Sequence, residues 1–378
     1  MIRFDAVSKE FPDGTVAVDA LSLTAASGQI TVLVGPSGCG KTTSLRMINR
    51  MIEPSAGTIT IDDRDVMSVP PAELRRGIGY VIQHAGLFPH RTVVDNVATV
   101  PLLTGTRRRE ARARAIELLE RVGLPASFAD RYPAQLSGGQ QQRVGVARAL
   151  AADPPVLLMD EPFSAVDPVV RDQLQQEFLR LQDELGKTIV FVTHDIDEAI
   201  RLGDQVAVLA VGGRLAQLAA PAELLARPAD PFVAGFVGRD RGYRALAFVS
   251  AEVAVTPEPT VALGSALARA HDVAVDEWVL VVDDAQRPQG WLHLRAHPDG
   301  GAGPAPGDVV SPDLLNLGGT LSPVGGTLRE ALDAALSSPS GRGVVVDDDG
   351  RLVGSVLAGT VLDHLREETA GVPARVHP

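Results

Sequence analysis

The chain has 378 residues, 45% of them hydrophobic, and a formal net charge of −12. It can therefore fill the cores of two domains, and it is not expected to bind nucleic acid through bulk electrostatics. Its one basic cluster, Arg107–Arg114, is interpreted as a solvated helix face.

The single cysteine, Cys39, excludes a disulfide framework or a cysteine-based metal site within one chain. The first residues lack the apolar stretch of a signal peptide, and no apolar run approaches the ~20 residues of a transmembrane helix. The sequence therefore predicts an intracellular protein that is soluble or peripheral to a membrane.

A phosphate-binding loop is predicted near the N-terminus. Residues 29–34 have the β-branched, apolar composition of a buried strand, and Leu45, Ile48 and Ile52 then recur at helical spacing. The junction follows the pattern GxxxxGK[ST]. It comprises Gly35, Pro36, Ser37, Gly38, Cys39, Gly40, Lys41, Thr42 and Thr43.

The residue types of this loop suit a triphosphate. Its glycines allow several backbone N–H groups to point at one anion, and the helix that begins near Lys41 adds its positive end. Lys41 supplies a compact charge to the β- and γ-phosphates, and Thr42 can place its hydroxyl on Mg²⁺. Cys39 is interpreted as a small filler residue.

A helix is predicted over 141–150, and Ser137 stands where its N-cap belongs. Gly138 and Gly139 would expose first-turn N–H groups, which makes a second anion site. Two half-sites for one triphosphate suggest a composite site across a dimer.

An apolar strand at 156–161 ends in two carboxylates. Asp160 suits Mg²⁺ coordination, directly or through water, and Glu161 suits a general base that deprotonates the attacking water.

The order of these motifs resembles that of ABC transporter ATPases over roughly residues 1–238. Leu136–Gln140, which includes Ser137, Gly138, Gly139 and Gln140, looks like their signature. The resemblance implies a Q-loop glutamine at Gln83, which senses Mg²⁺ and the membrane subunit, and a D-loop at Ser164–Asp167. It also implies a switch histidine at His194, after a strand at 188–193, and an adenine-stacking aromatic at Phe11.

The resemblance also implies a fold and an assembly. The fold is an α/β P-loop NTPase with a helical subdomain at about 85–150. Two copies sandwich ATP and Mg²⁺, each nucleotide lying between the Lys41 loop of one and Ser137–Gln140 of the other. Gly86–His90 transmits the movement to membrane-spanning permease subunits. The chain is then expected at the cytoplasmic face of the inner membrane.

An internal repeat is predicted after residue 238, with 239–245 as a linker and 246–378 as a second domain. Val281–Asp284 recurs as Val345–Asp348, and Gly290 as Gly354, at an offset of 64 residues. Helices are expected around Leu263 and Leu267 and around Leu328, Leu332 and Leu336, and residues 298–306 are expected to form a loop.

The repeat resembles a tandem pair of CBS modules, an α+β architecture that often binds adenine nucleotides or senses ionic conditions. Nucleotide-binding members often have Thr and Asp after the glycine, where this chain has His293, Ala296, Leu357 and Thr360. A small-molecule or ionic regulator and a purely structural or dimerising role both stay open. The structural rival is an oligosaccharide-binding-type β-barrel.

This domain combination resembles the ATPase subunits of quaternary-amine importers, which take up glycine betaine, choline, carnitine or proline-type osmoprotectants with an extracellular substrate-binding protein. The alternatives are an importer of another small polar solute such as an amino acid, a non-transport ABC ATPase, and a regulatory binder whose ATPase is silent.

Overall fold

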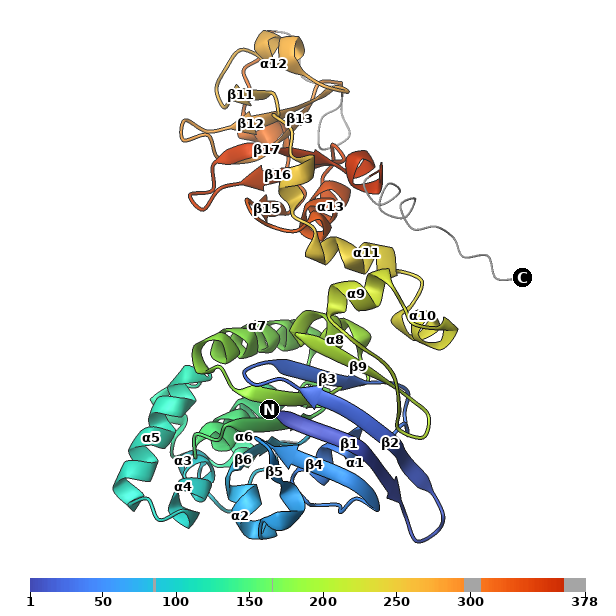
Figure 1. The fold of residues 1–378 in the computed structure, drawn as a ribbon. Coiled ribbons are helices and arrows are strands. Elements are labelled where there is room, and N and C mark those ends of the chain that lie inside the picture. Colours follow the sequence, from blue (N-terminus) through green and yellow to red (C-terminus); the bar gives the residue numbers. More distant parts are fainter. Residues whose placement is uncertain (84–85, 165, 296–306, 364–378) are drawn as a thin grey trace, which may run out of the picture. The chain divides into compact units, whose positions relative to one another are not determined.

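The computed structural model describes residues 1–83, 86–164, 166–295 and 307–363. The chain divides into two compact units, Met1–Arg239 and Asp240–Pro378, drawn in blue to green and in yellow to red in Figure 1. Three features of the sequence analysis lie outside the described residues: Ala165 of the expected D-loop, Ala296 and the predicted loop at 298–306.

A six-stranded sheet in the order β10-β9-β3-β8-β7-β6 forms the centre of the first unit. Its strands are parallel except β10, which pairs antiparallel with β9. Strands β3, β7 and β8 are buried along their whole length, as their continuous apolar runs predict. The bounds are β3 Ile30–Val34, β6 Ile78–Val81, β7 Val156–Asp160, β8 Thr188–Val192, β9 Gln205–Ala210 and β10 Arg214–Ala219.

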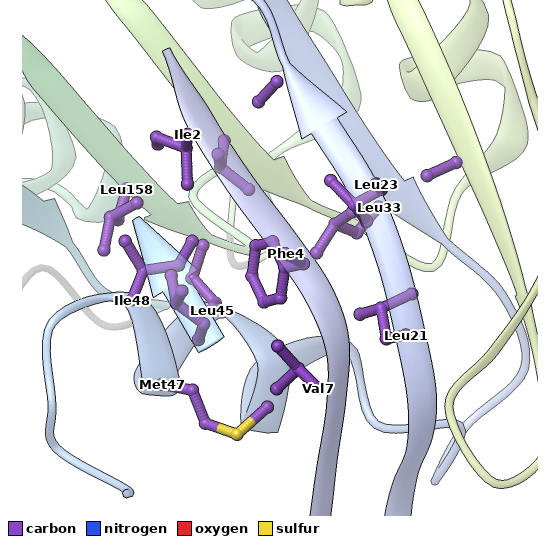
Figure 2. Packing of buried hydrophobic residues seen from close by; sticks show 14 of the residues in the cluster. Ile2, Phe4, Val7, Leu21, Leu23, Leu33, Leu45, Met47, Ile48 and Leu158 are labelled. Atoms are coloured by element: carbon purple, nitrogen blue, oxygen red, sulfur yellow. The ribbon is translucent and has the colours of Figure 1, made fainter. Parts of the chain in front are cut away.

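A second, antiparallel sheet in the order β2-β1-β4-β5 belongs to the same unit. Its side chains and those of the six-stranded sheet meet α1 (Lys41–Ile48) in one core, where Phe4, Leu33 and Leu45 are buried together (Figure 2). This core fixes the first residues of α1, and so the loop before it, against both sheets. The bounds are β1 Ile2–Glu10, β2 Val16–Ala25, β4 Ala56–Ile61 and β5 Arg64–Asp65.

Helices α3 to α6 lie between β6 and β7 in the chain, so the predicted helical insertion interrupts a parallel strand pair (Figure 1). Four arginines of the basic cluster are exposed, as predicted, whereas Arg112 is half-buried and pairs with Asp95 and Asp130. The bounds of the remaining helices are α2 Pro71–Arg76, α3 Val93–Val97, α4 Thr99–Leu103, α5 Arg108–Arg121, α6 Gly138–Leu150, α7 Pro168–Leu185, α8 Ile196–Leu202, α9 Pro221–Ala226 and α10 Pro231–Val237.

The ends of two helices differ from the prediction. Helix α1 stops at Ile48, so Ile52 lies beyond it: Arg50 takes a left-handed φ of 54°, and the Met51 N–H bonds back to the Arg46 carbonyl at 2.9 Å. Helix α6 begins at Gly138, directly after the predicted Ser137 N-cap, and so includes three residues before the predicted stretch 141–150.

Two smaller sheets make up the second unit, in the orders β11-β12-β13-β14 and β15-β16-β17. Helices α12 (Leu267–Val273) and α13 (Leu328–Ser337) precede β12 and β16. These open sheets with interposed helices do not match the rival β-barrel. The bounds are β11 Thr260–Ala262, β12 Trp278–Val282, β13 Pro288–His293, β14 Leu315–Asn316, β15 Leu321–Pro323, β16 Arg342–Val346 and β17 Leu352–Leu357.

The repeat at an offset of 64 residues is confirmed in the register of the strands. Val281 pairs with Gly290, and Val345 pairs with Gly354. Asp283 and Asp347 each accept a 2.8 Å hydrogen bond from the backbone N–H four residues later. The two hairpins therefore share the same turn as well as the same pairing.

Two expectations for this unit need correction. Leu263 lies in the turn before α12, not in the helix. Residues 241–245, expected as linker, form α11 (Arg241–Ala245), whose Tyr243 packs against the core around α13 and hydrogen-bonds to Asp333. Apolar burial and this bond attach the segment to the second unit.

Candidate nucleotide site

The phosphate loop follows β3 and passes very close to neighbouring backbone. A Cβ added at Gly35 would lie 2.3 Å from the Leu209 carbonyl oxygen, and one at Gly40 would lie 2.3 Å from that of Ala17. Gly40 also takes a φ of 92°. Only glycine fits these two positions, and the wrapped backbone makes a cradle for an anion.

Lys41 lies at the start of α1 with its side chain folded into the loop. Its ammonium donates to the carbonyl oxygens of Gly35 at 2.7 Å and Pro36 at 3.1 Å. Ser37 and Gly38 at the tip of the loop are exposed, while Cys39 is fully buried in the core cluster. Burial raises the pKa of the Cys39 thiol, partly opposed by the Lys41 charge, as suits a filler residue rather than a reactive thiol.

Thr42 and Asp160 meet beneath the loop. The Thr42 hydroxyl donates to Asp160 Oδ1 at 2.9 Å, and the Tyr80 hydroxyl and the Arg46 guanidinium lie 3.4 Å and 3.8 Å from Oδ2. Burial raises the pKa of the Asp160 carboxyl, against the lowering by Thr42 and Arg46. Two oxygen donors, one of them anionic, thus face the phosphate loop and suit a hard divalent cation.

Glu161 follows β7 in a left-handed conformation with φ at 46°. Its backbone N–H donates to the Val192 carbonyl at 2.9 Å, which fixes this strained residue between two strands. Its Oε2 lies 3.0 Å from His194 Nδ1 and 3.4 Å from Gln83 Nε2. In this conformation the carboxylate contacts the side chains of His194 and Gln83.

The topology explains why these residues meet. The phosphate loop, Gln83, Glu161 and His194 follow β3, β6, β7 and β8, which are parallel neighbours in one sheet. The carboxyl ends of parallel strands lie along one edge, where ligands bind in open α/β sheets. The structure therefore brings the predicted loop, carboxylates, glutamine and histidine together.

Two other predicted elements are not part of this cluster. Ser137 and Gln140 form a capping box with each other, with bonds of 3.3 Å and 3.0 Å. Gly138 is exposed and Gly139 half-buried, and within the described ranges this segment makes no hydrogen bond or ion pair with residues 35–43. Phe11 lies in the β1–β2 turn, where the Lys9 ammonium is 5.4 Å from its ring centre.

Sequence reasoning missed Arg46 and Tyr80, which both approach Asp160. Arg46 lies one helical turn after Thr42, so the spacing of the helix would have placed the two side chains on one face. Tyr80 points from the neighbouring strand β6, and only the strand order reveals its proximity.

Fold and site together define a P-loop nucleotide hydrolase. The family model for ABC transporters matches residues 18–164. A dimeric ATP-binding cassette solved in a post-hydrolysis state with ADP and Pi is 34% identical, with a TM-score of 0.54 over 58% of this chain and 99% of that chain. The protein cbiO1 of Clostridium perfringens, part of an ABC transporter complex, gives 30% identity and a TM-score of 0.56 over 60% of this chain and 90% of that chain.

Several curated relatives match nearly the whole chain. The choline transport ATP-binding protein OpuBA of Bacillus subtilis is 43% identical over 96% of both chains. The osmoprotectant import ATP-binding protein OsmV of Salmonella typhimurium is 42% identical over 97% of this chain and 96% of its own. The carnitine transport ATP-binding protein OpuCA of Listeria monocytogenes is 42% identical over 96% of this chain and 91% of its own.

The chain belongs to the ATP-hydrolysing, ATP-binding subunits of ABC transporters. Within the described ranges, none of its helices combines the length and the apolar character that a bilayer crossing requires.

Proposed function

We propose that this chain drives the import of a quaternary-amine osmoprotectant, of the glycine betaine, choline, carnitine or proline type, by hydrolysing ATP. One observation carries the substrate class: identity of 41–43% across at least 96% of this chain with subunits named for choline, osmoprotectant or carnitine transport. An importer of another small polar solute, such as an amino acid, is the alternative.

The phosphate loop binds the triphosphate of ATP through its backbone N–H groups, with the Lys41 ammonium opposing the β- and γ-phosphate charge. The close approaches at Gly35 and Gly40 support this role, because they leave the cradle free of side chains. Mg²⁺ fits the oxygen donors here: Thr42, Asp160 and Gln83 would hold it, and it would neutralise phosphate charge.

Glu161 acts as the general base for the attacking water. Its strained backbone and its contacts with His194 and Gln83 support this role, since both neighbours orient the carboxylate. His194 lies close enough to Glu161 to report the state of the γ-phosphate to the base.

A second copy completes the site with Ser137–Gln140, whose capped helix start presents the N–H groups of Gly138 and Gly139. Phe11 stacks on adenine. Gly86–His90 contacts membrane-spanning permease subunits, so the chain is peripheral at the cytoplasmic face of the inner membrane, and an extracellular binding protein delivers the solute. The dimeric state of the solved cassette supports the paired arrangement.

The second unit is a tandem CBS pair, 246–378 with α11 attached, that regulates the ATPase. Its two repeats bury a shared contact made by Leu280, Trp291, Val344 and Val346. A pocket of about 320 Å³ beside this contact, lined by Trp291, Thr320 and Arg342 among others, is large enough for a small-molecule or ionic regulator.

Reconstitution tests the proposal. The chain, purified with the membrane subunits that accompany it, is placed in liposomes with a matching binding protein and ATP on the cytoplasmic side. We expect ATP-dependent accumulation of labelled glycine betaine, choline or carnitine. Accumulation of histidine alone would select the amino-acid alternative, and hydrolysis without solute movement would favour a non-transport ATPase.

A further inference from the structure

A buried carboxylate near the site is not used by any role assigned above. Glu198 lies in the first turn of α8 and is only 6% exposed. Its hydrogen-bonding side chains are neutral: the Gln175 amide donates to Oε1 at 3.0 Å, and hydrogen bonding with the Thr193 hydroxyl lowers the pKa of the carboxyl, as the Arg171 charge also does. Burial is the largest of the effects that raise its pKa. A buried carboxylate whose hydrogen bonds come from neutral groups is costly for folding, so its presence calls for a reason.

The contacts of Glu198 lead directly to the residues beside His194. The Thr193 hydroxyl that donates to Glu198 accepts the Asp195 N–H at 3.0 Å. Thr193 and Asp195 are the two chain neighbours of His194, so this relay fixes the backbone on both sides of it. Asp195 also caps α8, accepting from the Asp197 and Glu198 N–H groups at 2.9 Å and 3.4 Å.

His194 itself has little side-chain support. Its imidazole is 59% exposed and contacts Glu161 at 3.0 Å. A side chain with so few contacts takes its direction from its backbone. The orientation of His194 toward the base therefore depends on how firmly the Thr193–Asp195 segment is held.

Glu198 is in turn anchored to α7. Gln175, which donates to it, accepts at its own Oε1 from Arg201 at 3.1 Å, so the amide orientation is fixed from both ends. A second, more exposed link runs in parallel: Arg171 lies 4.0 Å from Asp195 and donates to the Val166 carbonyl at 3.2 Å. Val166 belongs to the segment that precedes α7, expected to contact a second copy.

We propose that Glu198 is a positioning residue for ATP hydrolysis: through the Thr193 hydroxyl it fixes the backbone that carries His194, and through Gln175 it ties that backbone to α7. The inference rests on the proposed role of His194 in hydrolysis. Glu198 does not touch nucleotide, so nucleotide affinity does not depend on it.

The test is steady-state and single-turnover ATP hydrolysis by the full-length chain. Glu198→Ala is expected to lower kcat about tenfold while KM for ATP stays within about twofold. Thr193→Val, which removes the relay hydroxyl at nearly constant volume, should give the same defect. Glu198→Gln keeps an oxygen acceptor and should recover activity to within about threefold of wild type.

A double-mutant cycle separates positioning from general damage. In a His194→Ala background, Glu198→Ala should cost less than about twofold further, because the side chain it orients is gone. The matched control is Asp197→Asn, which neutralises the exposed carboxylate of the preceding residue and should leave kcat unchanged. Thermal unfolding of each variant checks the fold. If Glu198→Ala does not fold, the kcat values of Thr193→Val and Glu198→Gln test the positioning role instead.

The outcomes are distinct. Full activity of Thr193→Val and Glu198→Ala with a defective His194→Ala would overturn the positioning role alone. Full activity of His194→Ala would overturn the proposed role of His194 and the positioning role with it. Independent, multiplying losses in the cycle would make Glu198 a structural residue and overturn the inference.

Discussion

The two units of the chain hold their polar side chains in opposite ways. In the first unit, Glu161 is shared between His194 and Gln83 at an open sheet edge, and Lys41 bonds to carbonyls of its own loop. In the second unit, Arg342 and Glu258 pair at 2.8 Å with both side chains 4% exposed. Arg342 also donates to the Val275 carbonyl, and Glu258 accepts from the Ser355 hydroxyl at 2.5 Å.

The difference separates side chains expected to take part in ATP hydrolysis from side chains that stabilise the fold. A group that must change partners during a reaction needs neighbours that it can exchange, as Glu161 and Lys41 have. The Arg342–Glu258 pair has its partners saturated and joins parts of the second unit that are far apart in sequence. A saturated buried pair gives geometric definition at the cost of desolvation.

The largest effect that this comparison predicts is at Glu161. Glu161→Gln keeps the shape and the hydrogen-bonding capacity of the side chain but removes the base, so kcat should fall by at least roughly 10²-fold. ATP binding should persist, because the loop residues are intact. Phosphate release measures kcat, and equilibrium binding of labelled ATP measures nucleotide affinity.

Glu184→Gln is the matched control, since this exposed carboxylate lies on α7 and pairs with exposed Arg180 at 2.9 Å. Its kcat should match wild type. Unchanged turnover in Glu161→Gln would show that Glu161 is not the base. The contrast between exchangeable contacts at Glu161 and fully paired contacts at Arg342–Glu258 would then not reflect a difference between catalytic and structural groups.

The sequence predicted the first unit well because its motifs are local. The strand, loop and helix around Gly35–Thr43, the Ser137 cap and the strand before Asp160 each depend on a few consecutive residues. That these motifs meet in one site was predicted from their order along the chain, which resembles that of ABC transporter ATPases. Arg46 was missed although its helical spacing from Thr42 was visible in the sequence, whereas Tyr80 was missed because its proximity to Asp160 arises from strand order, which no short pattern encodes.

In the second unit the sequence revealed periodicity but not long-range contacts. The pairing of Val281 with Gly290 and of Val345 with Gly354 was visible as a repeat. The Arg342–Glu258 pair was not visible in the sequence, because its members are 84 residues apart and their contact does not follow the 64-residue repeat. The positive φ of Glu161 was equally hidden, since tertiary contacts impose it.

An intermediate effect is predicted for the buried pair. Arg342→Ala leaves Glu258 charged and buried without its cation, so it should destabilise the second unit by about 3 kcal/mol. The guanidinium also covers the Trp291 ring at 5.0 Å, so tryptophan fluorescence should change with the transition. Denaturant unfolding followed by that fluorescence measures the loss.

Arg351→Ala provides the contrast, because Arg351 is 57% exposed and lies 3.7 Å from exposed Asp349. Its unfolding free energy should change by less than about 0.5 kcal/mol. Equal stabilities of the two variants would mean that the Arg342–Glu258 pair contributes no more than a surface pair, contrary to the architectural role assigned to it.

The smallest effect is predicted for removal of the second unit. A chain ending after Arg239 keeps every residue of the nucleotide cluster, so basal kcat should stay within about twofold of the full-length value. A chain ending after Ala245 retains α11 but loses the Asp333 and α13 contacts of Tyr243, and the apolar surface it exposes should make it associate more readily on size-exclusion chromatography.

The proposed regulatory role gives a separate test. Only the full-length chain should change its hydrolysis rate in response to salt or an added ligand. An identical response from the chain that ends after Arg239 would reduce the second unit to a scaffold, and a tenfold loss of basal activity there would show that the two units do not work independently.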